Sequence, residues 1–258
     1  MTRPPSLPPG YRLYHTGEID STNEEARRRA EAGEPGGLWI MADRQTAGRG
    51  RRGRAWVSPA GNLFCTLLLR PNCRPAKAAE LSFVAGLALH DAVTTLILAD
   101  RQATLRLKWP NDLLYEDKKL AGILLDSATA RRDVLAWLAI GVGLNLATHP
   151  EEAEFPATSL AAATGRRSSP AEALAALAWA MDARLQLWQT ADGFARIRAD
   201  WLERAAGVGA PITVRLSNET LHGVFEGLEE DGALRLGLKP GGHRLISAGD
   251  VFFPARPS

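Results

Sequence analysis

The sequence predicts an α+β fold in which a mixed, largely antiparallel sheet is covered by helices and followed by a small β-barrel. Residues 112–147 have the pattern of an apolar meander with polar turns. Two helical segments follow within residues 170–205, and short strands separated by Gly and Asn turns begin after residue 207. We therefore expect two domains, over residues 1–206 and 207–258.

The first predicted helix begins in the segment "DSTNEEARRRAEAG". Ser21 followed by Glu24 is a capping-box pattern, in which the hydroxyl accepts from an amide of the first turn and the carboxylate accepts from the cap amide. We expect the helix to cover residues 22–32 and to end at Gly33.

Hydrophobic periodicity gives the other elements. Residues 77–98 carry apolar side chains at helical spacing, as do the two later segments "PAEALAALAWAMDARLQLWQ" and "GFARIRADWLERA". The strands expected in the large domain are "GLWIMA", "NLFCTLLLR", "TLRLKW", "DLLY", "LAGILLDSA" and "VLAWLAIGVGLNL". The strands expected in the barrel are "ITVRL", "TLHGVFEGLEE", "ALRLGL" and "HRLISAGDV".

The composition is that of an ordered globular protein, with 258 residues, 45% of them hydrophobic and 23% charged. The opening "MTRPPSLPPG" lacks the apolar core of a signal peptide, and the apolar run at residues 134–147 is too short to span a bilayer. We expect a cytoplasmic protein without a membrane partner. Cys65 and Cys73 fit neither a disulfide framework nor a metal pair, and we expect a buried strand position for the first and a loop for the second.

The segment "QTAGRGRRGRAW" at residues 45–56, called the arginine loop below, concentrates positive charge in a chain whose net charge is only +2. Its glycines fit the dinucleotide fingerprint literally, but a Pro and a Gly-Asn pair follow where a helix should open. Two alternatives stay open: an RNA-binding loop, although no further RNA-binding motif accompanies it, and a solvated turn. The local charge favours an anionic ligand.

Three further segments support a ligand site. In "KWPNDLL", Asn111 and Asp112 stand at a strand end, where they form either a simple turn or a place for a phosphate and Mg²⁺. In "KLAGIL", Lys119 is either an edge-strand charge or a cation pointed into the site. "GVGLN" at the end of a buried strand is either a β-bulge or a place of close backbone approach.

The motifs "STN", "GRGRRGRAW", "KWPND", "KLAGIL" and "GVGLN", in this order and followed by a small β-domain, resemble the biotin protein ligases. The resemblance implies the class II synthetase fold of biotin and lipoate ligases, with an SH3-like barrel at the C-terminal end. It covers nearly the whole chain and leaves no room for the N-terminal helix-turn-helix of some members. The chain therefore looks like the ligase-only form, and we expect no DNA binding.

Such a ligase joins biotin to ATP, in the presence of Mg²⁺, to make biotinyl-5′-AMP. It then transfers biotin to one lysine of a biotin carboxyl carrier protein of acetyl-CoA carboxylase. By this resemblance the arginine loop would close over the intermediate and exclude water. We expect the loop to be mobile when empty because it repels itself and lacks apolar anchors. A monomer and a homodimer both fit the sequence.

The resemblance also assigns site residues, with Arg51 and Lys119 as the catalytic pair at the carboxylate and phosphate end. Ser21, Thr22 and Gln45 are expected to read the ureido group, and Ser21 could combine this role with its cap. The residues expected to bind biotin are Ser21, Thr22, Asn23, Gln45, Gly48, Arg49, Gly50, Arg51, Trp56 and Lys119, with Trp56 as an apolar wall and backbone amides of Arg49 and Gly50 facing the ligand. The residues expected at ATP are Arg51, Asn111, Asp112, Lys119 and Asn145, with Asp112 as the magnesium ligand.

Three other functions compete with this one. A lipoate or octanoate transferase shares the fold family, but the arginine loop together with "KWPND" favours biotin. A nucleic-acid-binding module would need only the basic loop and the barrel. A biotin carrier would need an Ala-Met-Lys-Met-type turn, whereas the three methionines stand at positions 1, 41 and 181.

Overall fold

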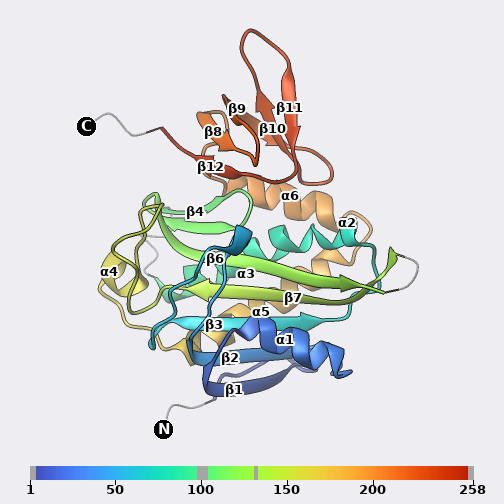
Figure 1. Cartoon of the computed structure of the whole chain (residues 1–258), viewed down its shortest axis with the longest axis vertical. Coiled ribbons are helices and arrows are strands. Elements are labelled where there is room, and N and C mark those ends of the chain that lie inside the picture. The colour runs from blue at the N-terminus through green and yellow to red at the C-terminus, as the bar shows by residue number, and fades with distance from the viewer. Residues whose placement is uncertain (1–3, 98–103, 131–132, 255–258) are drawn as a thin grey trace.

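The computed structural model describes residues 4–97, 104–130 and 133–254. In this part of the chain, a seven-stranded sheet has the order β1-β2-β3-β7-β6-β5-β4 (Figure 1). Its strands are β1 (Arg12–Ile19), β2 (Leu38–Gln45), β3 (Leu63–Leu69), β4 (Leu105–Lys108), β5 (Asp112–Tyr115), β6 (Lys118–Thr129) and β7 (Leu135–Leu144). The β1–β2 pair is parallel and the other pairs are antiparallel. The mixed, largely antiparallel sheet predicted from the sequence is confirmed.

Helices cover the sheet on two faces, as the alternation of side chains in β2 shows. Trp39 and Met41 belong to the main core with α3 (Leu81–Leu96) and α5 (Pro170–Trp188), whereas Ile40 packs with α1 (Thr22–Glu31) on the other face. Figure 1 shows α1 in front of the sheet and α3 and α5 behind it. Because α1 covers only part of its face, the remaining part is available for a site.

Two elements were missed and one helix is divided. β1 carries mostly polar or half-exposed side chains at the sheet edge, so its sequence gives no apolar signal. Helix α4 (Leu160–Thr164) is only five residues long. The helix expected at residues 77–98 is divided into α2 (Pro75–Ala78) and α3, and its expected last residue, Leu98, lies outside the described residues.

The capping box expected at the start of α1 is wrong. The Ser21 side chain makes no cap hydrogen bond, and Glu24 instead forms ion pairs with Arg27 and Arg49. These arginines compete with the backbone for the carboxylate. A complete capping box stands at the start of α5, between Ser169 and Glu172.

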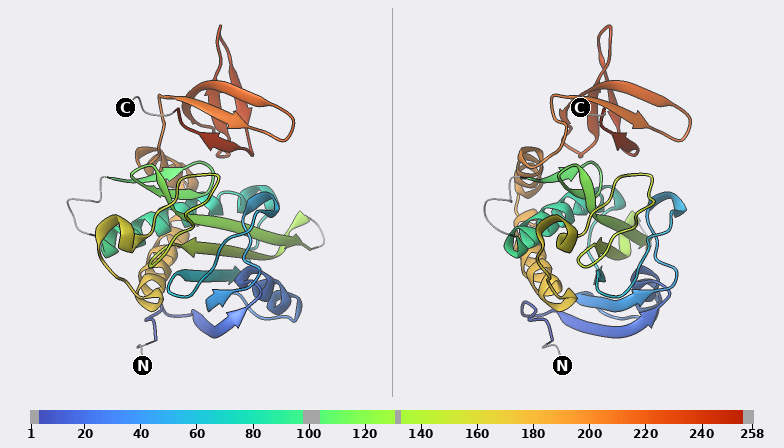
Figure 2. Two further views of the ribbon diagram at one scale, coloured as in Figure 1. Left: turned by 60° about the vertical axis from the view of Figure 1, so that its left-hand side comes forward. Right: turned by 90° about the vertical axis from the view of Figure 1, so that its left-hand side faces the viewer.

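The C-terminal part is a five-stranded antiparallel sheet with the order β11-β10-β9-β8-β12, which confirms the predicted SH3-like barrel. Its strands are β8 (Pro211–Arg215), β9 (Thr220–Leu228), β10 (Leu234–Gly237), β11 (His243–Ile246) and β12 (Asp250–Phe252). Figure 2 shows this sheet beside α6 (Gly193–Glu203), at the β4 end of the large sheet. Ile212 and Phe225 of the barrel belong to the same apolar core as α3 and α5, so the two parts pack directly.

Two smaller expectations can also be compared with the structure. Cys65 is buried in β3 and Cys73 is half-buried in a loop, and both are free. Within the described residues, no helix is long and apolar enough to cross a membrane.

Candidate active site

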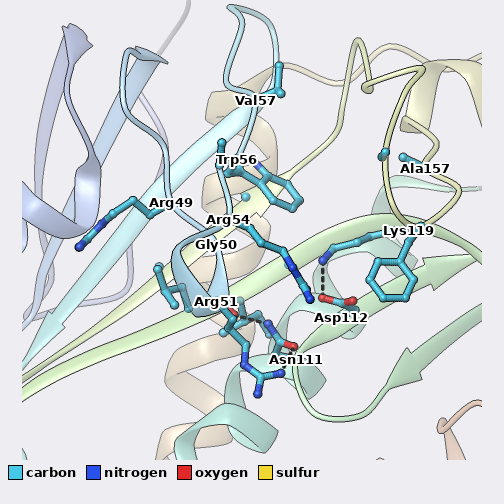
Figure 3. A pocket seen from close by; sticks show the side chains of 18 of the residues that line it. Arg49, Gly50, Arg51, Arg54, Trp56, Val57, Asn111, Asp112, Lys119 and Ala157 are labelled. Carbon is cyan, nitrogen blue, oxygen red and sulfur yellow. Dashed lines mark hydrogen bonds and ion pairs between the residues drawn. The ribbon is translucent and has the colours of Figure 1, made fainter. Parts of the chain in front are cut away.

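A cavity of about 270 Å³ opens on the sheet face that α1 leaves uncovered (Figure 3). It collects residues from the start of α1, the arginine loop, strands β5 to β7, the loop before α4, and β12 of the barrel. Of the residues predicted from the sequence, it brings together Ser21, Thr22, Asn23, Gln45, Arg49, Gly50, Arg51, Trp56, Asn111, Asp112, Lys119 and Asn145. Gly48 lies behind the lining, where a Cβ would stand 2.4 Å from the Trp56 carbonyl oxygen.

Bare backbone forms the floor of the cavity. A Cβ on Gly143 would lie 2.4 Å from Trp56 Nε1, and a Cβ on Gly122 would lie 3.2 Å from the same indole ring. A Cβ on Gly141 would lie 2.1 Å from Asn23 Oδ1. The pairing of β7 with β3 is regular here, so the β-bulge interpretation of "GVGLN" is wrong. The glycines admit Trp56 and Asn23, and these side chains then line the cavity.

The start of α1 supplies an uncharged, hydrogen-bonded end. The amide and the hydroxyl of Thr22 both donate to Gln45 Oε1, at 2.8 and 3.1 Å. Gln45 Nε2 donates to Ser58 Oγ at 3.0 Å, so the side-chain amide of Gln45 is fixed with its oxygen toward Thr22. Ser21 is buried beside this network.

Asn23 is held by both ends of its amide. Its Nδ2 donates to Asp126 Oδ2 at 2.8 Å, and its Oδ1 accepts from the Thr66 hydroxyl at 2.7 Å. These bonds tie α1 to β6 and β3. Asn23 lines the cavity, but its side-chain amide is already hydrogen-bonded to Asp126 and Thr66.

The opposite end of the cavity is charged. Lys119 Nζ lies 2.7 Å from Asp112 Oδ1, and the aspartate is buried at the first position of β5 (Figure 3). Lys119 pairs with Leu114 on one side and bridges to Ala157 on the other, so the edge-strand interpretation is wrong.

A β-bulge aims Lys119 into the cavity. The register of β5 against β6 shifts so that Leu113 faces Ala121 while Leu114 faces Lys119. Regular alternation would place Lys119 and Gly122 on opposite faces, yet a Cβ on Gly122 would lie 3.3 Å from Lys119 Cε. The bulge therefore turns the ammonium group toward the glycine floor and Trp56, whose ring centroid lies 5.4 Å from Nζ.

Arg51 extends the charged end. Its Nη1 donates to Asn111 Oδ1 at 3.2 Å and to the Gly249 carbonyl oxygen at 3.3 Å. Asn111 Nδ2 donates in turn to the Ile123 carbonyl oxygen at 2.7 Å, which fixes the orientation of its amide. Burial lowers the pKa of the Arg51 guanidinium, while Asp250 and Asp112 oppose that shift. An arginine stays charged under such conditions and provides a fixed cation.

The other arginines of the loop have carboxylate partners, which corrects the expectation that the loop repels itself. Arg49 contacts Glu24 and Asp126, and its side chain points away from the cavity (Figure 3). Arg52 and Arg54 contact Asp250. These acids come from other segments, which is why the local sequence did not reveal them. These ion pairs remove the basis on which the empty loop was expected to be mobile.

The Gly50 amide, which is expected to face the ligand, is bonded within the loop in this conformation. Gly50 N donates to the Arg54 carbonyl oxygen at 2.7 Å and closes the loop on itself.

Asn145 is buried at the end of β7, and its Nδ2 donates to the Thr158 carbonyl oxygen at 3.1 Å. It lines the cavity at the end where the loop before α4 passes.

Lys108 was missed, although it begins the "KWPND" motif. It is buried, its Nζ lies 3.8 Å from the centroid of the Phe155 ring, and burial lowers its pKa to about 8. Asp112 and Asp250 raise this pKa, and Lys119 and Arg54 lower it. A lysine at the end of a strand, directly before Trp-Pro, was the available signal.

Comparison with known proteins identifies the family. Residues 17–145 match the Biotin/lipoate A/B protein ligase family, and residues 207–253 match the Biotin protein ligase C terminal domain. A Biotin--[acetyl-CoA-carboxylase] ligase of Paracoccus denitrificans is 46% identical over 239 residues, which cover 91% of this chain and 97% of that protein. The chain belongs to the biotin protein ligase family.

Solved structures resemble the ligase over the same length. The biotin protein ligase of Aquifex aeolicus in complex with biotin and ATP has a TM-score of 0.76 and 28% identity, and covers 93% of this chain and 97% of its own. The enzyme of Leishmania major in complex with biotinyl-5-AMP has a TM-score of 0.62 and 25% identity, over 93% and 100% of the two chains. The ligase therefore shares both its fold and its C-terminal domain with enzymes of this family.

Proposed function

We propose that this ligase activates biotin with ATP to biotinyl-5′-AMP and then transfers biotin to a lysine of the biotin carboxyl carrier protein of acetyl-CoA carboxylase. One observation carries the proposal: a single cavity joins an uncharged hydrogen-bonding end at Thr22 and Gln45 to a cationic end at Arg51 and Lys119. Biotin has a neutral ureido ring at one end and a carboxylate at the other. The polarity of the cavity matches that of the substrate.

The uncharged end suits the ureido ring. Thr22 and Gln45 present hydroxyl and amide groups whose orientations are fixed by their mutual bonds and by Ser58, and Ser21 is buried beside them. A fixed pattern of donors and acceptors discriminates strongly, because a wrong ligand leaves buried polar groups unpaired. Trp56 gives the apolar ring system a flat wall over the glycine floor.

The charged end suits adenylation. A carboxylate oxygen of biotin must bond to the α-phosphorus of ATP while the bond to pyrophosphate breaks, and both reactants are anions. Arg51 and Lys119 lie on the same cavity and reduce this repulsion without having to reorganise. Asn111 orients Arg51, and Asn145 lies where the nucleotide would extend.

Asp112 fits the role of a magnesium ligand. Its carboxylate is buried at the cavity, and Oδ1 has the Lys119 ammonium as its ion-pair partner at 2.7 Å. Magnesium is commonly bound by one or two carboxylates together with substrate phosphates, and the described residues offer no cluster of three or more metal-binding side chains. When bound, the ion would neutralise phosphate charge.

The second step needs the acceptor amine to attack the acyl carbon of biotinyl-5′-AMP, with AMP leaving and the amine losing a proton. Until then the mixed anhydride must be kept from water, and the arginine loop stands over the cavity for this purpose. We assign this chemistry to residues 1–206 and a supporting role to the barrel of residues 207–258. The absence of DNA binding, the cytoplasmic location and the oligomeric state stay predictions.

The proposal is tested by mixing the protein with ATP and Mg²⁺ and either biotin or lipoate, and measuring acyl-AMP by mass spectrometry. We expect biotinyl-AMP and release of pyrophosphate with biotin only. Formation with lipoate alone would replace the assignment by lipoate ligase. Salt-sensitive RNA binding without ATP turnover would support the nucleic-acid alternative instead.

A further inference from the structure

The arginines at positions 49, 51, 52 and 54 differ in their partners. Arg52 Nη1 lies 3.1 Å from Asp250 Oδ2, and Arg54 Nη2 lies 2.5 Å from the same oxygen. Arg49 pairs with acids outside the cavity. Among the described residues, no carboxylate oxygen lies within 4.0 Å of the Arg51 guanidinium. The ion pairs therefore leave one loop guanidinium without an anion.

The buried Asp250 carboxylate holds the guanidinium groups of Arg52 and Arg54 at a fixed position. It is the first residue of β12, where it pairs with Arg215 of β8, and only 6% of it is exposed. The carbonyl oxygen of the preceding residue, Gly249, accepts from Arg51. Two consecutive barrel residues thus contact three arginines of the loop.

We propose that Asp250 is a positioning residue for biotin activation: by holding Arg52 and Arg54 it orders the arginine loop over the cavity and leaves Arg51 for the substrate. The inference rests on the proposed function, since it gives the barrel a role in that reaction. It also explains why, among the described residues, a loop so rich in arginine leaves one guanidinium without a carboxylate partner rather than forming a broad anion-binding surface.

The physical reason is pre-organisation. A loop that is ordered before the ligand arrives loses less conformational entropy on binding. Without the carboxylate, Arg52 and Arg54 would repel Arg51, and the segment would lose its contact with the barrel. Glu154 pairs with Arg54 at 3.3 Å, but it is 40% exposed and does not contact Arg52, so it cannot replace Asp250.

The test compares Asp250→Asn with the parent in the full chain. Hydrogen exchange of residues 45–56, without substrates, should be about tenfold faster or more in the variant, because the two charge-assisted hydrogen bonds from Arg52 and Arg54 are weakened. Loss of bound biotinyl-AMP should accelerate by a similar factor, while kcat of pyrophosphate exchange at saturating substrates should change less. Glu219→Gln, which breaks the barrel pair of Glu219 with Arg244 away from the loop, should match the parent.

A second set of variants separates positioning from folding. The double variant Arg52→Gln, Arg54→Gln should reproduce the effect of Asp250→Asn, and adding Asp250→Asn to it should change nothing further. Asp250→Glu should restore slow loss of biotinyl-AMP at least partly. Unchanged loop exchange in Asp250→Asn, tighter retention, or an additive triple variant would each overturn the proposal.

A failure of the proposed function would give a different set of results from a failure of the Asp250 proposal. If the parent itself made no biotinyl-AMP, the function would be wrong. The exchange of the loop would still report whether Asp250 orders it, because that measurement needs no substrate.

Discussion

The two ends of the cavity are built in opposite ways. At the uncharged end, Thr22, Gln45 and Ser58 satisfy one another's hydrogen bonds and fix one another's orientation. At the charged end, Lys119 pairs with Asp112, while the guanidinium of Arg51 has no carboxylate partner among the described residues and leaves positive charge at the cavity. The first end can recognise a ligand by its shape and hydrogen-bond pattern. The second end creates a positive electrostatic potential that attracts anionic groups.

This difference predicts different kinetic consequences. Changes at the uncharged end should act on the binding of biotin, with little dependence on salt or pH. Changes at the charged end should act on the chemical step and on ATP. Mutations at the two ends should therefore have separable effects on KM and kcat.

The largest effect is expected for Lys119→Ala. Removing a cation aimed at developing phosphate charge should slow biotin-dependent pyrophosphate exchange by about 10²–10³-fold. Lys118→Ala is the matched control, because the neighbouring lysine is exposed and lies outside the cavity lining. Exchange at the parental rate would remove Lys119 from the active site.

Because Lys119→Ala leaves the buried Asp112 without its cation, its thermal stability must be followed as well. Lys119→Ala with Asp112→Asn should recover stability without recovering exchange. Recovery of both would mean that Lys119 only neutralises the buried charge of Asp112, and it would also contradict Asp112 as the magnesium ligand.

A smaller but more specific effect is expected for Gly143→Ala. Its Cβ would meet Trp56 Nε1 at 2.4 Å, so the indole must leave the glycine floor and enter the biotin slot. We expect the KM for biotin to rise by about tenfold or more, as for loss of a buried aromatic contact. Gly17→Ala, a strand glycine with open space around its Cβ position, serves as control. Equal biotin KM values for the two variants would contradict the assigned wall.

Thr22→Val removes one hydroxyl at the uncharged end and keeps the shape. The KM for biotin should rise about tenfold, the size of a lost hydrogen bond in a buried site, with kcat nearly unchanged. The neighbouring exposed Thr46→Val should behave as the parent, because Thr46 does not line the cavity. A fall in kcat at constant KM would place Thr22 in the chemical step instead.

The smallest effect is a pH dependence from Lys108. Its pKa is lowered to about 8 by burial, so the charge is lost as pH rises through 8. We expect the KM for ATP to rise severalfold between pH 7 and 9, and the binding of biotin alone to stay constant. Lys108→Met should abolish the dependence, and a parental pH profile in this variant would exclude Lys108.

The same shift has a consequence for stability. The pKa of Lys108 lies below the ordinary lysine value of 10.5, so the unfolded chain binds more protons between pH 8 and 10.5. The contribution of this group to the free energy of unfolding therefore rises with pH across that window. Denaturant titrations of the parent and of Lys108→Met should converge at the upper limit.

The sequence predicted the sheet and its helices well, because these elements carry strong apolar periodicity. It missed β1, whose side chains are mostly polar. It also predicted a capping box at Ser21, although the Glu24 carboxylate forms ion pairs with arginines instead. Most predicted site residues lie around one cavity because their motifs stand at strand ends and turns. Asp250 could not be found from the sequence, since it meets the arginine loop only through the packing of the barrel on the large domain.

The bulge beside Lys119 illustrates the same limit. A two-residue alternation along β6 would turn Lys119 away from the face that carries Gly122. Only the register of the folded sheet shows that both face the cavity.

The most direct test of the two-ended cavity is a crystal structure with a non-hydrolysable analogue of biotinyl-AMP. We predict the ureido group within hydrogen-bond distance of Thr22 and Gln45, and the acyl-phosphate group within reach of Arg51 and Lys119. An analogue bound in the reverse direction, or with its phosphate contacting neither cation, would contradict the account.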